Sequence, residues 1–265
     1  MYIMFYQSYA TMESRIVINS LPSQATLADN ITRVQLNIAQ AAGRVGRQPE
    51  DITLVAVSKT KPVELIKAAY ELGIHNFGEN RVQDALPKIA EFRHAGLHPV
   101  TWHMIGHLQR NKVNKVVGSF DSIHSVDNFQ LAQALNRHAA ELELRVAVLL
   151  QVNISGEESK EGVTPADALL LAQQLVALSQ LNVQGLMTVA PQVQNPEEAR
   201  PVFRNLRVLR DRLREEVPQS AWQHLSMGMT DDYCIAIEEG ATIVRVGRAI
   251  FGERERIQHT PQATL

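Results

Sequence analysis

Cysteine is almost absent from this sequence, which has one, Cys234, in 265 residues. A single cysteine excludes a disulfide within the chain and a zinc site built from several thiolates. So little cysteine is typical of proteins from a reducing compartment, and we therefore expect a cytoplasmic protein. We expect the Cys234 thiol to be packed rather than reactive.

Long apolar runs and a targeting segment are also missing. No stretch approaches the roughly 18 consecutive apolar residues of a transmembrane helix. Residues 1–25 do not combine a basic segment with a continuous apolar one, as a signal peptide would. We expect no membrane association, a poorly ordered extension over residues 1–25 and a C-terminal tail over residues 255–265. We therefore expect one folded domain over residues 26–254.

Neither sign of charge is in excess. The 26 Lys and Arg residues are balanced by 28 Asp and Glu, which gives a net charge of -2. This balance provides no basic surface for a nucleic-acid backbone, so we expect no nucleic-acid partner. The apolar fraction of 45% is ordinary for a globular protein.

The sequence does contain a regular alternation of short β-rich runs with helical segments. The runs cover residues 52–59, 75–80, 101–106, 122–127, 146–153, 183–189, 224–227 and 242–247. Eight such units in a chain of this length predict an α/β fold, a single TIM-type (β/α)8 barrel. The alternative is a doubly wound open sheet. An extra helix is predicted ahead of the first strand, over residues 27–45.

Capping residues and prolines predict the starts of several helices. One helix is expected between Pro62 and Gly73, and another with Thr164 as its N-cap and Pro165 as its first residue. Two short helices are expected near the C-terminus. The first starts at residue 231 or 232, and the second covers the "RAIF" segment.

Lys59 ends the first predicted strand, in the segment "LVAVSKTKP". Strand alternation places Val55, Val57 and Lys59 on one face. If the valines line the barrel interior, Lys59 points into the mouth of the barrel, where such folds bind ligands. Desolvation there lowers the pKa of a lysine and favours the neutral amine that forms a Schiff base. The alternative is a lysine that reaches solvent along its flexible stem, which suits Lys61 better.

Two further segments, "LSMGMTDD" and "VRVGRAIFG", follow the last two strands, where this barrel commonly binds phosphate. In the first, the Ser226 hydroxyl and the backbone around Gly228 and Met229 suit an anion cradle. In the second, Gly247 and Arg248 lie where a short helix begins. Each segment alone is equally well explained as a tight turn that binds no ligand. Because both segments fall where this barrel commonly binds phosphate, we favour a phosphate site.

Arg245 shares the inward face of the last strand with Ile243 and Gly247. A buried guanidinium needs a carboxylate, a phosphate or a ring nitrogen as its acceptor. An ion pair inside the barrel is the alternative. A Schiff-base lysine, a phosphate cradle and a buried arginine together describe a pyridoxal phosphate site.

Nine histidines raise the question of a metal site. His94, His98 and His103 do not share a helix face, and no acidic cluster accompanies them, so we expect no metal ligand. Residues 107–115 are expected to form a solvated helix face, and residues 155–162 a mobile loop at the rim of the site.

Seven segments of the chain resemble the pyridoxal phosphate homeostasis protein family. They are "AVSKTKP", "FGENRVQ", "WHMIGHLQRNK", "VNISGEESKEG", "GLMTVAP", "LSMGMTDD" and "VRVGRAIFG". The resemblance extends from about residue 27 to residue 254. It implies the fold of the N-terminal barrel domain of alanine racemase, a fold type III pyridoxal phosphate barrel.

The resemblance also implies roles for single residues. Lys59 would bind the cofactor as a Schiff base, with Lys61 as its non-bonded neighbour. Arg245 would face the pyridine nitrogen and keep it unprotonated, which weakens the ring as an electron sink. The remaining implied cofactor-binding residues are Asn80 beside the ring, and Ser226, Gly228, Met229, Gly247 and Arg248 at the phosphate. His103 and Met187 are further candidates near the ring.

The function implied by the resemblance is maintenance of the intracellular pyridoxal phosphate supply. We expect a monomer that carries the cofactor to pyridoxal phosphate-dependent apo-enzymes without strong turnover. The few residues after Gly252 cannot form the β-rich domain that supplies an acid–base tyrosine in alanine racemases. Two alternatives remain. One is a single-domain amino-acid racemase, and the other is an aldolase that uses Lys59 without a cofactor and holds a sugar phosphate at residues 226–229.

Overall fold

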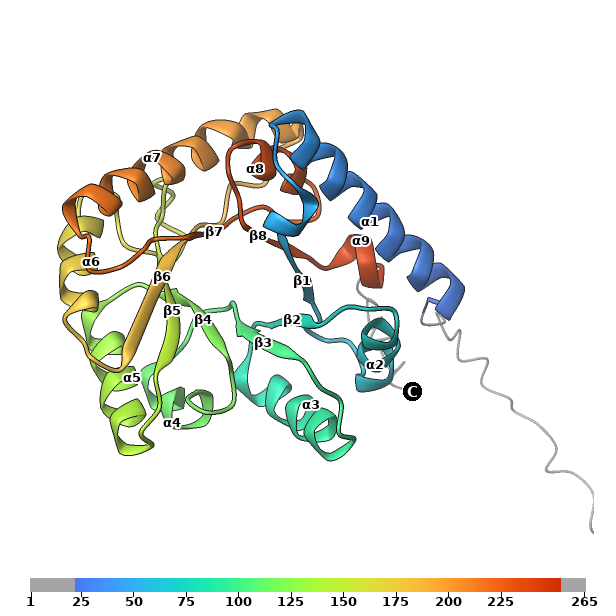
Figure 1. Ribbon diagram of the computed structural model, residues 1–265, viewed down its shortest axis with the longest axis horizontal. Helices are drawn as coiled ribbons and strands as arrows, with labels where there is room; N and C mark the ends of the chain where they lie inside the picture. The colour runs from blue at the N-terminus through green and yellow to red at the C-terminus, as the bar shows by residue number, and fades with distance from the viewer. Residues whose placement is uncertain (1–21, 254–265) are drawn as a thin grey trace, which may run out of the picture.

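Eight parallel strands form a closed barrel in the computed structural model of the chain, which describes residues 22–253. The strands follow one another around the barrel in chain order, and the last pairs with the first. Figure 1 shows the helices arranged around this ring of strands. The predicted barrel is confirmed, and the open-sheet alternative is wrong. The predicted extension and tail lie almost entirely outside the described residues.

All eight strands lie within or close to the predicted runs. Their bounds are β1 Thr53–Val57, β2 Asn76–Glu79, β3 Thr101–Met104, β4 Ser122–Val126, β5 Val146–Gln151, β6 Leu181–Met187, β7 His224–Ser226 and β8 Ile243–Val246.

The helices in the described part of the chain connect successive strands or flank the barrel. Their bounds are α1 Gln24–Arg44, α2 Val63–Glu71, α3 Val82–His94, α4 Val113–Val116, α5 Phe129–Glu141, α6 Ala168–Val176, α7 Arg200–Glu216, α8 Tyr233–Glu238 and α9 Arg248–Phe251. Three short 3₁₀ turns, Pro49–Asp51, Arg110–Lys112 and Pro196–Ala199, complete the set.

Some predicted helix starts differ from the structure by a few residues. The first helix begins at Gln24 because the Ser23 hydroxyl caps it by accepting from the Thr26 N–H. The helix predicted to start at Pro165 begins at Ala168 instead. Thr164 still accepts a hydrogen bond from the Asp167 N–H, but it closes a turn ahead of the helix. The "RAIF" helix, α9, is where the sequence predicts it.

The apolar core lies mainly outside the barrel, between the strands and the surrounding helices. Inside the barrel, one small separate cluster of buried apolar residues contains Val55, Leu149, Met187 and Ile243. Much of the remaining barrel interior is polar, which is unusual for a layer that only fills space. The interior is therefore where the chemistry of this fold should be sought.

The N-terminal helix α1 packs against the last two helices. Asn30 donates to the carbonyl of Ile250 at 3.0 Å, and Asn37 donates to the Tyr233 hydroxyl at 3.0 Å. These contacts fix α8 and α9, which follow the strands of the predicted phosphate cradle. Cys234 in α8 is half-buried, and burial raises the pKa of its thiol, as expected of a packed cysteine. In residues 22–253, no helix has both the length and the hydropathy of a membrane span.

Candidate functional site

Lys59 lies in the turn between β1 and α2, two residues past the end of the strand. The strand is thus shorter than predicted, and Lys59 belongs to its loop. The next residue, Thr60, has a φ of +63°, a left-handed conformation that is uncommon outside glycine. The preceding Ser58 is fully buried and bonds to β2 through its N–H, which donates to the Gly78 carbonyl at 3.0 Å. The half-buried Lys59 is therefore held in a defined turn at the barrel mouth.

A buried ion pair between Lys88 and Glu79 stabilises this turn by bonding to Ser58. The Lys88 ammonium lies 2.8 Å from Oε1 of Glu79 and donates to the Ser58 carbonyl at 2.9 Å. The Ser58 hydroxyl donates to the same carboxylate oxygen at 2.7 Å. Glu79 is fully buried, and its second oxygen has no hydrogen-bond partner among the described residues. The sequence analysis placed Glu79 only within the predicted run 75–80 and did not consider Lys88, which lies in a helix.

Arg245 and Lys59 come from neighbouring strands because β8 closes the barrel against β1. Val55 pairs with Arg245, and Ala56 pairs with Val246. One residue further, a Cβ atom on Gly247 would lie 3.4 Å from the Val57 side chain. The Schiff-base candidate and the residues after β8 therefore share one end of the barrel.

Arg245 is buried inside the barrel, as alternation predicts. It donates from Nη1 to the Ser226 hydroxyl at 2.5 Å and from Nη2 to the Thr188 carbonyl at 2.8 Å. Burial lowers the pKa of its guanidinium to about 10, and the nearby Asp232 opposes that shift. None of the ion pairs found among residues 22–253 involves Arg245, so the ion-pair alternative is wrong. Two protein acceptors leave other N–H groups of the guanidinium for a ligand.

The turn after β7, where the sequence predicts an anion cradle, is sharp and closely packed against α8. Gly228 has a φ of +91°, and a Cβ atom there would lie 2.6 Å from Cβ of Ala236. The N–H groups of Gly228, Gly247 and Arg248 donate to no residue in the described part of the chain. They are therefore available to a phosphate.

The predicted donor Met229 has a competitor. Its N–H donates to Oδ1 of Asp232 at 2.6 Å, and burial raises the pKa of this carboxyl group. A phosphate would have to displace Asp232 to use the Met229 N–H. Sequence reasoning treated Asp232 only as a helix start, so this competition was missed.

The Ser226 hydroxyl faces a network inside the barrel that the sequence analysis did not find. Its Oγ lies 3.0 Å from Nδ1 of His124, and Nε2 of His124 lies 3.0 Å from Nδ1 of His103. Nε2 of His103 in turn lies 3.1 Å from Oδ1 of Asn76, the first residue of β2. His103 thus lies inside the barrel, with a protein group within hydrogen-bond distance of each of its ring nitrogens.

Asn80 directly follows β2, and Met187 is the last residue of β6. The Oδ1 atom of Asn80 is buried and has no partner among the described residues. A Cβ atom on Gly106 would lie 2.3 Å from the Asn80 carbonyl oxygen, so the chain after β3 approaches Asn80 closely. Met187 belongs to the small apolar cluster inside the barrel. Asn80 therefore offers an unused acceptor next to the strand end, whereas Met187 is part of the apolar lining of the interior.

Lys61 bonds to the C-terminal end of α9, whereas the predicted phosphate cradle lies at the N-terminal end of that helix. Its ammonium donates to the carbonyls of Phe251 at 3.0 Å, Gly252 at 3.4 Å and Glu253 at 3.2 Å. A cation at a helix C-terminus is favourable because the last carbonyls carry partial negative charge. The two lysines of "SKTKP" are thus not equivalent, since Lys61 ties the Lys59 loop to α9.

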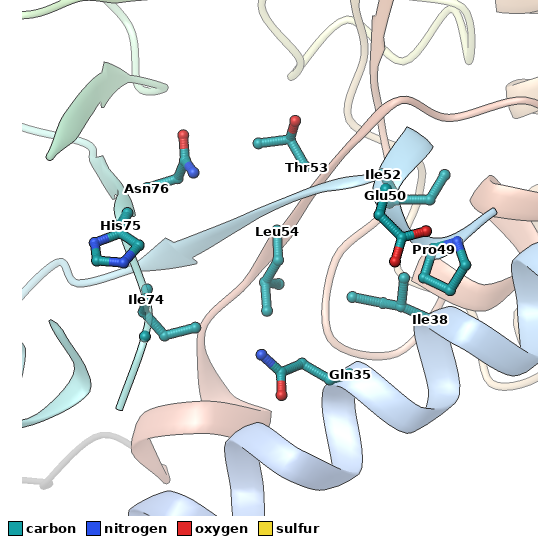
Figure 2. Close-up of a pocket in the computed structure, with 11 residues that line it drawn as sticks. Gln35, Ile38, Pro49, Glu50, Ile52, Thr53, Leu54, Ile74, His75 and Asn76 are labelled. Carbon is teal, nitrogen blue, oxygen red and sulfur yellow. The ribbon is translucent and has the colours of Figure 1, made fainter. Parts of the chain in front are cut away.

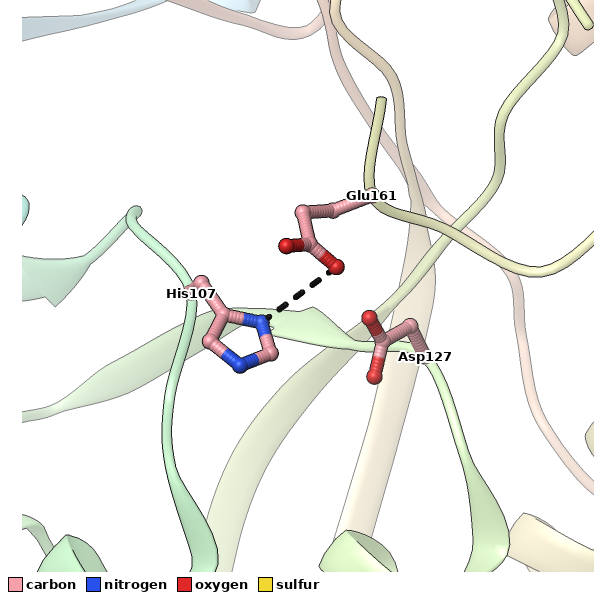
Figure 3. Close-up of side chains that lie close together, drawn as sticks. All are labelled: His107, Asp127 and Glu161. Atoms are coloured by element: carbon pink, nitrogen blue, oxygen red, sulfur yellow. Dashed lines mark ion pairs between the residues drawn. The ribbon is translucent and has the colours of Figure 1, made fainter. Parts of the chain in front are cut away.

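Three potential metal ligands approach one another at the rim of the barrel (Figure 3). His107, Asp127 and Glu161 each offer a ligand atom, and these atoms lie within 4.8 Å of one another. Nδ1 of His107 lies 3.6 Å from the Glu161 carboxylate, and Asn128 donates to Asp127 at 2.7 Å. His107 and Glu161 are exposed, so an ion pair in water explains the cluster as well as a cation does. The sequence analysis did not consider this group.

A cavity of about 470 Å³ lies at the other end of the barrel, next to α1 (Figure 2). Gln35 and Ile38 of α1, Leu54 of β1 and His75 line part of it. Asn76, the last member of the network inside the barrel, also lines this cavity. The interior network therefore reaches from the predicted cofactor end of the barrel to this opposite cavity.

Comparison with known proteins identifies the family. The family model of the alanine racemase N-terminal domain matches residues 23–255 of this sequence. The pyridoxal phosphate homeostasis protein of Aquifex aeolicus is 43% identical over 227 residues, which cover 86% of this chain and 98% of the relative. The Escherichia coli K12 protein of the same name is 42% identical over 86% of this chain and 97% of its own length.

A solved structure gives the same result in three dimensions. The structure of PipY from Synechococcus elongatus with pyridoxal phosphate bound superposes with a TM-score of 0.75 and is 38% identical. The match covers 85% of this chain and all of PipY. The chain therefore belongs to the pyridoxal phosphate homeostasis protein family, whose fold is that of the alanine racemase N-terminal domain.

Proposed function

We propose that this chain binds pyridoxal 5'-phosphate as a Schiff base with Lys59 and maintains the supply of that cofactor as a carrier. The observation that carries the proposal is the pairing of β8 with β1. Together with the pairing of β7 with β8, this pairing brings the Lys59 loop, buried Arg245 and the glycine turn after β7 to one end of the barrel. The PipY structure with this cofactor bound, and the names of the relatives, support the choice of ligand.

The chemistry of the groups present fits this cofactor. An aldehyde needs an amine, which Lys59 provides at the mouth. A phosphate needs several donors, and Gly228, Gly247 and Arg248 have N–H groups without a described partner. A pyridine nitrogen needs a donor, which Arg245 supplies, and the buried Asn80 oxygen accepts from a ligand hydroxyl or N–H.

Each residue then has a binding or positioning task. Lys59 would hold the aldehyde carbon, and the bound cofactor would supply an electron sink for carbanions formed next to an amino group. Arg245 keeps its proton because even its lowered pKa of about 10 lies well above neutrality, so it donates to the ring nitrogen without protonating it. An unprotonated pyridine is a weak electron sink, which favours retention and delivery of the cofactor over carbanion chemistry.

The decisive experiment is absorption spectroscopy followed by chemical trapping. Pyridoxal phosphate is added to apo-protein, reduced with borohydride, and the modified residue is located by mass spectrometry. We expect modification at Lys59, none in Lys59→Ala, and full modification in Lys61→Ala, the matched control in the same loop. Trapping that persists in Lys59→Ala contradicts the assignment.

The carrier role requires a second measurement. Loaded protein is mixed with the apo-form of a pyridoxal phosphate-dependent transaminase, with a phosphatase present to destroy free cofactor. We expect activation that survives the phosphatase. Activation that the phosphatase abolishes contradicts delivery, and exchange of the α-proton of a single-enantiomer amino acid for deuterium would favour a racemase. We also propose a monomer, for which light scattering should give a mass near 29.6 kDa, and a mass near twice that value would contradict it.

A further inference from the structure

A continuous chain of side chains crosses the interior of the barrel from Arg245 to Asn76. It runs through Ser226, His124 and His103, with separations of 2.5, 3.0, 3.0 and 3.1 Å between successive partner atoms. Ser226 and His124 are fully buried, and His103 is 5% exposed. The five residues come from five elements, β8, β7, β4, β3 and β2, so the chain joins strands on opposite sides of the barrel.

The acceptor at the far end of the chain, together with neutral rings, fixes the direction of every bond. The Oδ1 atom of Asn76 can only accept, so His103 donates to it from Nε2, and Nδ1 of a neutral His103 accepts from Nε2 of His124. Nδ1 of a neutral His124 then accepts the proton of the Ser226 hydroxyl. Ser226 Oγ accepts from Arg245, since a guanidinium can only donate. All hydrogens therefore point away from Arg245.

This direction is possible only if both histidines are neutral and carry their proton on Nε2. Burial lowers the pKa of His103 to about 4 and that of His124 well below its usual value. In this arrangement, a second proton on either ring would face a hydrogen of the neighbouring group, so the direction of the bonds would be lost. The chain thus has one arrangement at neutral pH, and hydrogen bonds aligned in one direction strengthen one another.

The arrangement also determines what Ser226 can do. Its only proton is committed to His124, so its oxygen serves as an acceptor for Arg245 and has no hydrogen left for a phosphate. In this role Ser226 orients the guanidinium, and the phosphate depends on backbone N–H groups.

We infer that His124, His103 and Asn76 are positioning residues. They fix Ser226 as the acceptor that orients Arg245 toward the ring nitrogen of the cofactor. The inference rests on the proposed function for the identity of that ligand, whereas the direction of the chain is a property of the protein alone. It also predicts that a change at Asn76, beside the opposite cavity, alters cofactor binding from a distance.

The first test needs no cofactor. Two-bond ¹⁵N–¹H spectra of the imidazoles in apo-protein at pH 7.5, assigned with His103→Gln and His124→Gln, report the tautomer of each ring. We expect both rings to be neutral with the proton on Nε2. A proton on Nδ1 of either ring, or an imidazolium, overturns the inference even if the cofactor binds.

The second test measures coupling to the ligand. We expect Asn76→Leu to weaken pyridoxal phosphate binding about three- to tenfold and to shift the pH dependence of its long-wavelength absorption. Gln35→Leu, which lines the same cavity but lies outside the chain of bonds, should change neither. Unchanged affinity and absorption in Asn76→Leu overturn the positioning role.

A pair of substitutions at His124 separates positioning from general packing. His124→Gln keeps an acceptor toward Ser226 and a donor toward His103, so its affinity should stay within about threefold of the parent. His124→Phe keeps the bulk but neither bond, and should lose about tenfold or more. Equal affinities of the two variants overturn the inference. If the parent protein shows no cofactor absorption at all, the proposed function fails while the tautomer result stands by itself.

Discussion

At the scale of single residues, the Lys59 loop depends on a charge pair that water hardly reaches. Glu79 is fully buried, and the side chain of Lys88 is 11% exposed. Ser58, one residue before Lys59, bonds to both members of the pair. Removing one partner of such a pair leaves the other charge buried and uncompensated, which costs far more than the net contribution of the pair.

We therefore predict that Lys88→Met lowers the free energy of unfolding by about 3 kcal/mol. The control is Lys67→Met, which breaks an ion pair of equally short length, 2.7 Å, with the exposed Glu91. That change should cost less than about 1 kcal/mol. Urea denaturation followed by circular dichroism measures both. The double variant Glu79→Gln/Lys88→Met should lose less than the sum of the two single variants, and strict additivity would contradict a coupled pair.

At the scale of elements, the turn between β7 and α8 depends on one glycine. Gly228 combines a left-handed φ with contact to α8, where a Cβ atom would lie 2.9 Å from Cα of Tyr233. Gly43 in α1 has neither feature, because nothing lies within 4 Å of the position of its Cβ. The two glycines thus allow the same substitution to be compared in a constrained and an unconstrained site.

We predict that Gly228→Ala destabilises the protein by about 2 kcal/mol or more and weakens binding of phosphate-bearing ligands. Gly43→Ala should instead stabilise it by roughly 0.5–1 kcal/mol, since alanine is the better helix former. Thermal unfolding with and without inorganic phosphate distinguishes the two effects. A Gly228→Ala protein that is as stable as the parent would show that the turn can relax.

The elements also show which parts of this structure sequence patterns can predict. Alternation and punctuation locate all eight strands and α9, because these signals are local. His124 escapes the pattern because β4 has an irregular register, in which Ile123 and Val126 pair with Val148 and Leu150. Its partner Ser226 is 102 residues away in sequence, and only closure of the barrel brings the two together. Lys88 and Asp232 were missed for the same reason, since their roles depend on tertiary contacts.

At the scale of the whole molecule, the polar interior makes stability depend on pH. His103 and His124 fold as neutral rings, with pKa values below the usual 6.5. Above about pH 6.5 both rings are neutral in the folded and unfolded states, so they have no effect. Below it the unfolded chain binds protons that the folded protein does not, and unfolding is favoured. The half-buried His224 acts in the same direction.

We predict that the free energy of unfolding falls by roughly 2 kcal/mol per buried histidine between pH 7 and pH 5. For His103 the loss should level off below about pH 4, where its ring is protonated in the folded state as well. The lowered pKa of Glu239, which Arg204 and Arg200 hold down, adds a further loss only at more acidic pH.

Urea midpoints at pH 7.5, 6 and 5 test the range in which histidines dominate the loss of stability. The His103→Gln/His124→Gln variant should show a much flatter profile there, whatever its stability at neutral pH. Equal slopes for the variant and the parent would place the acid sensitivity outside the barrel interior.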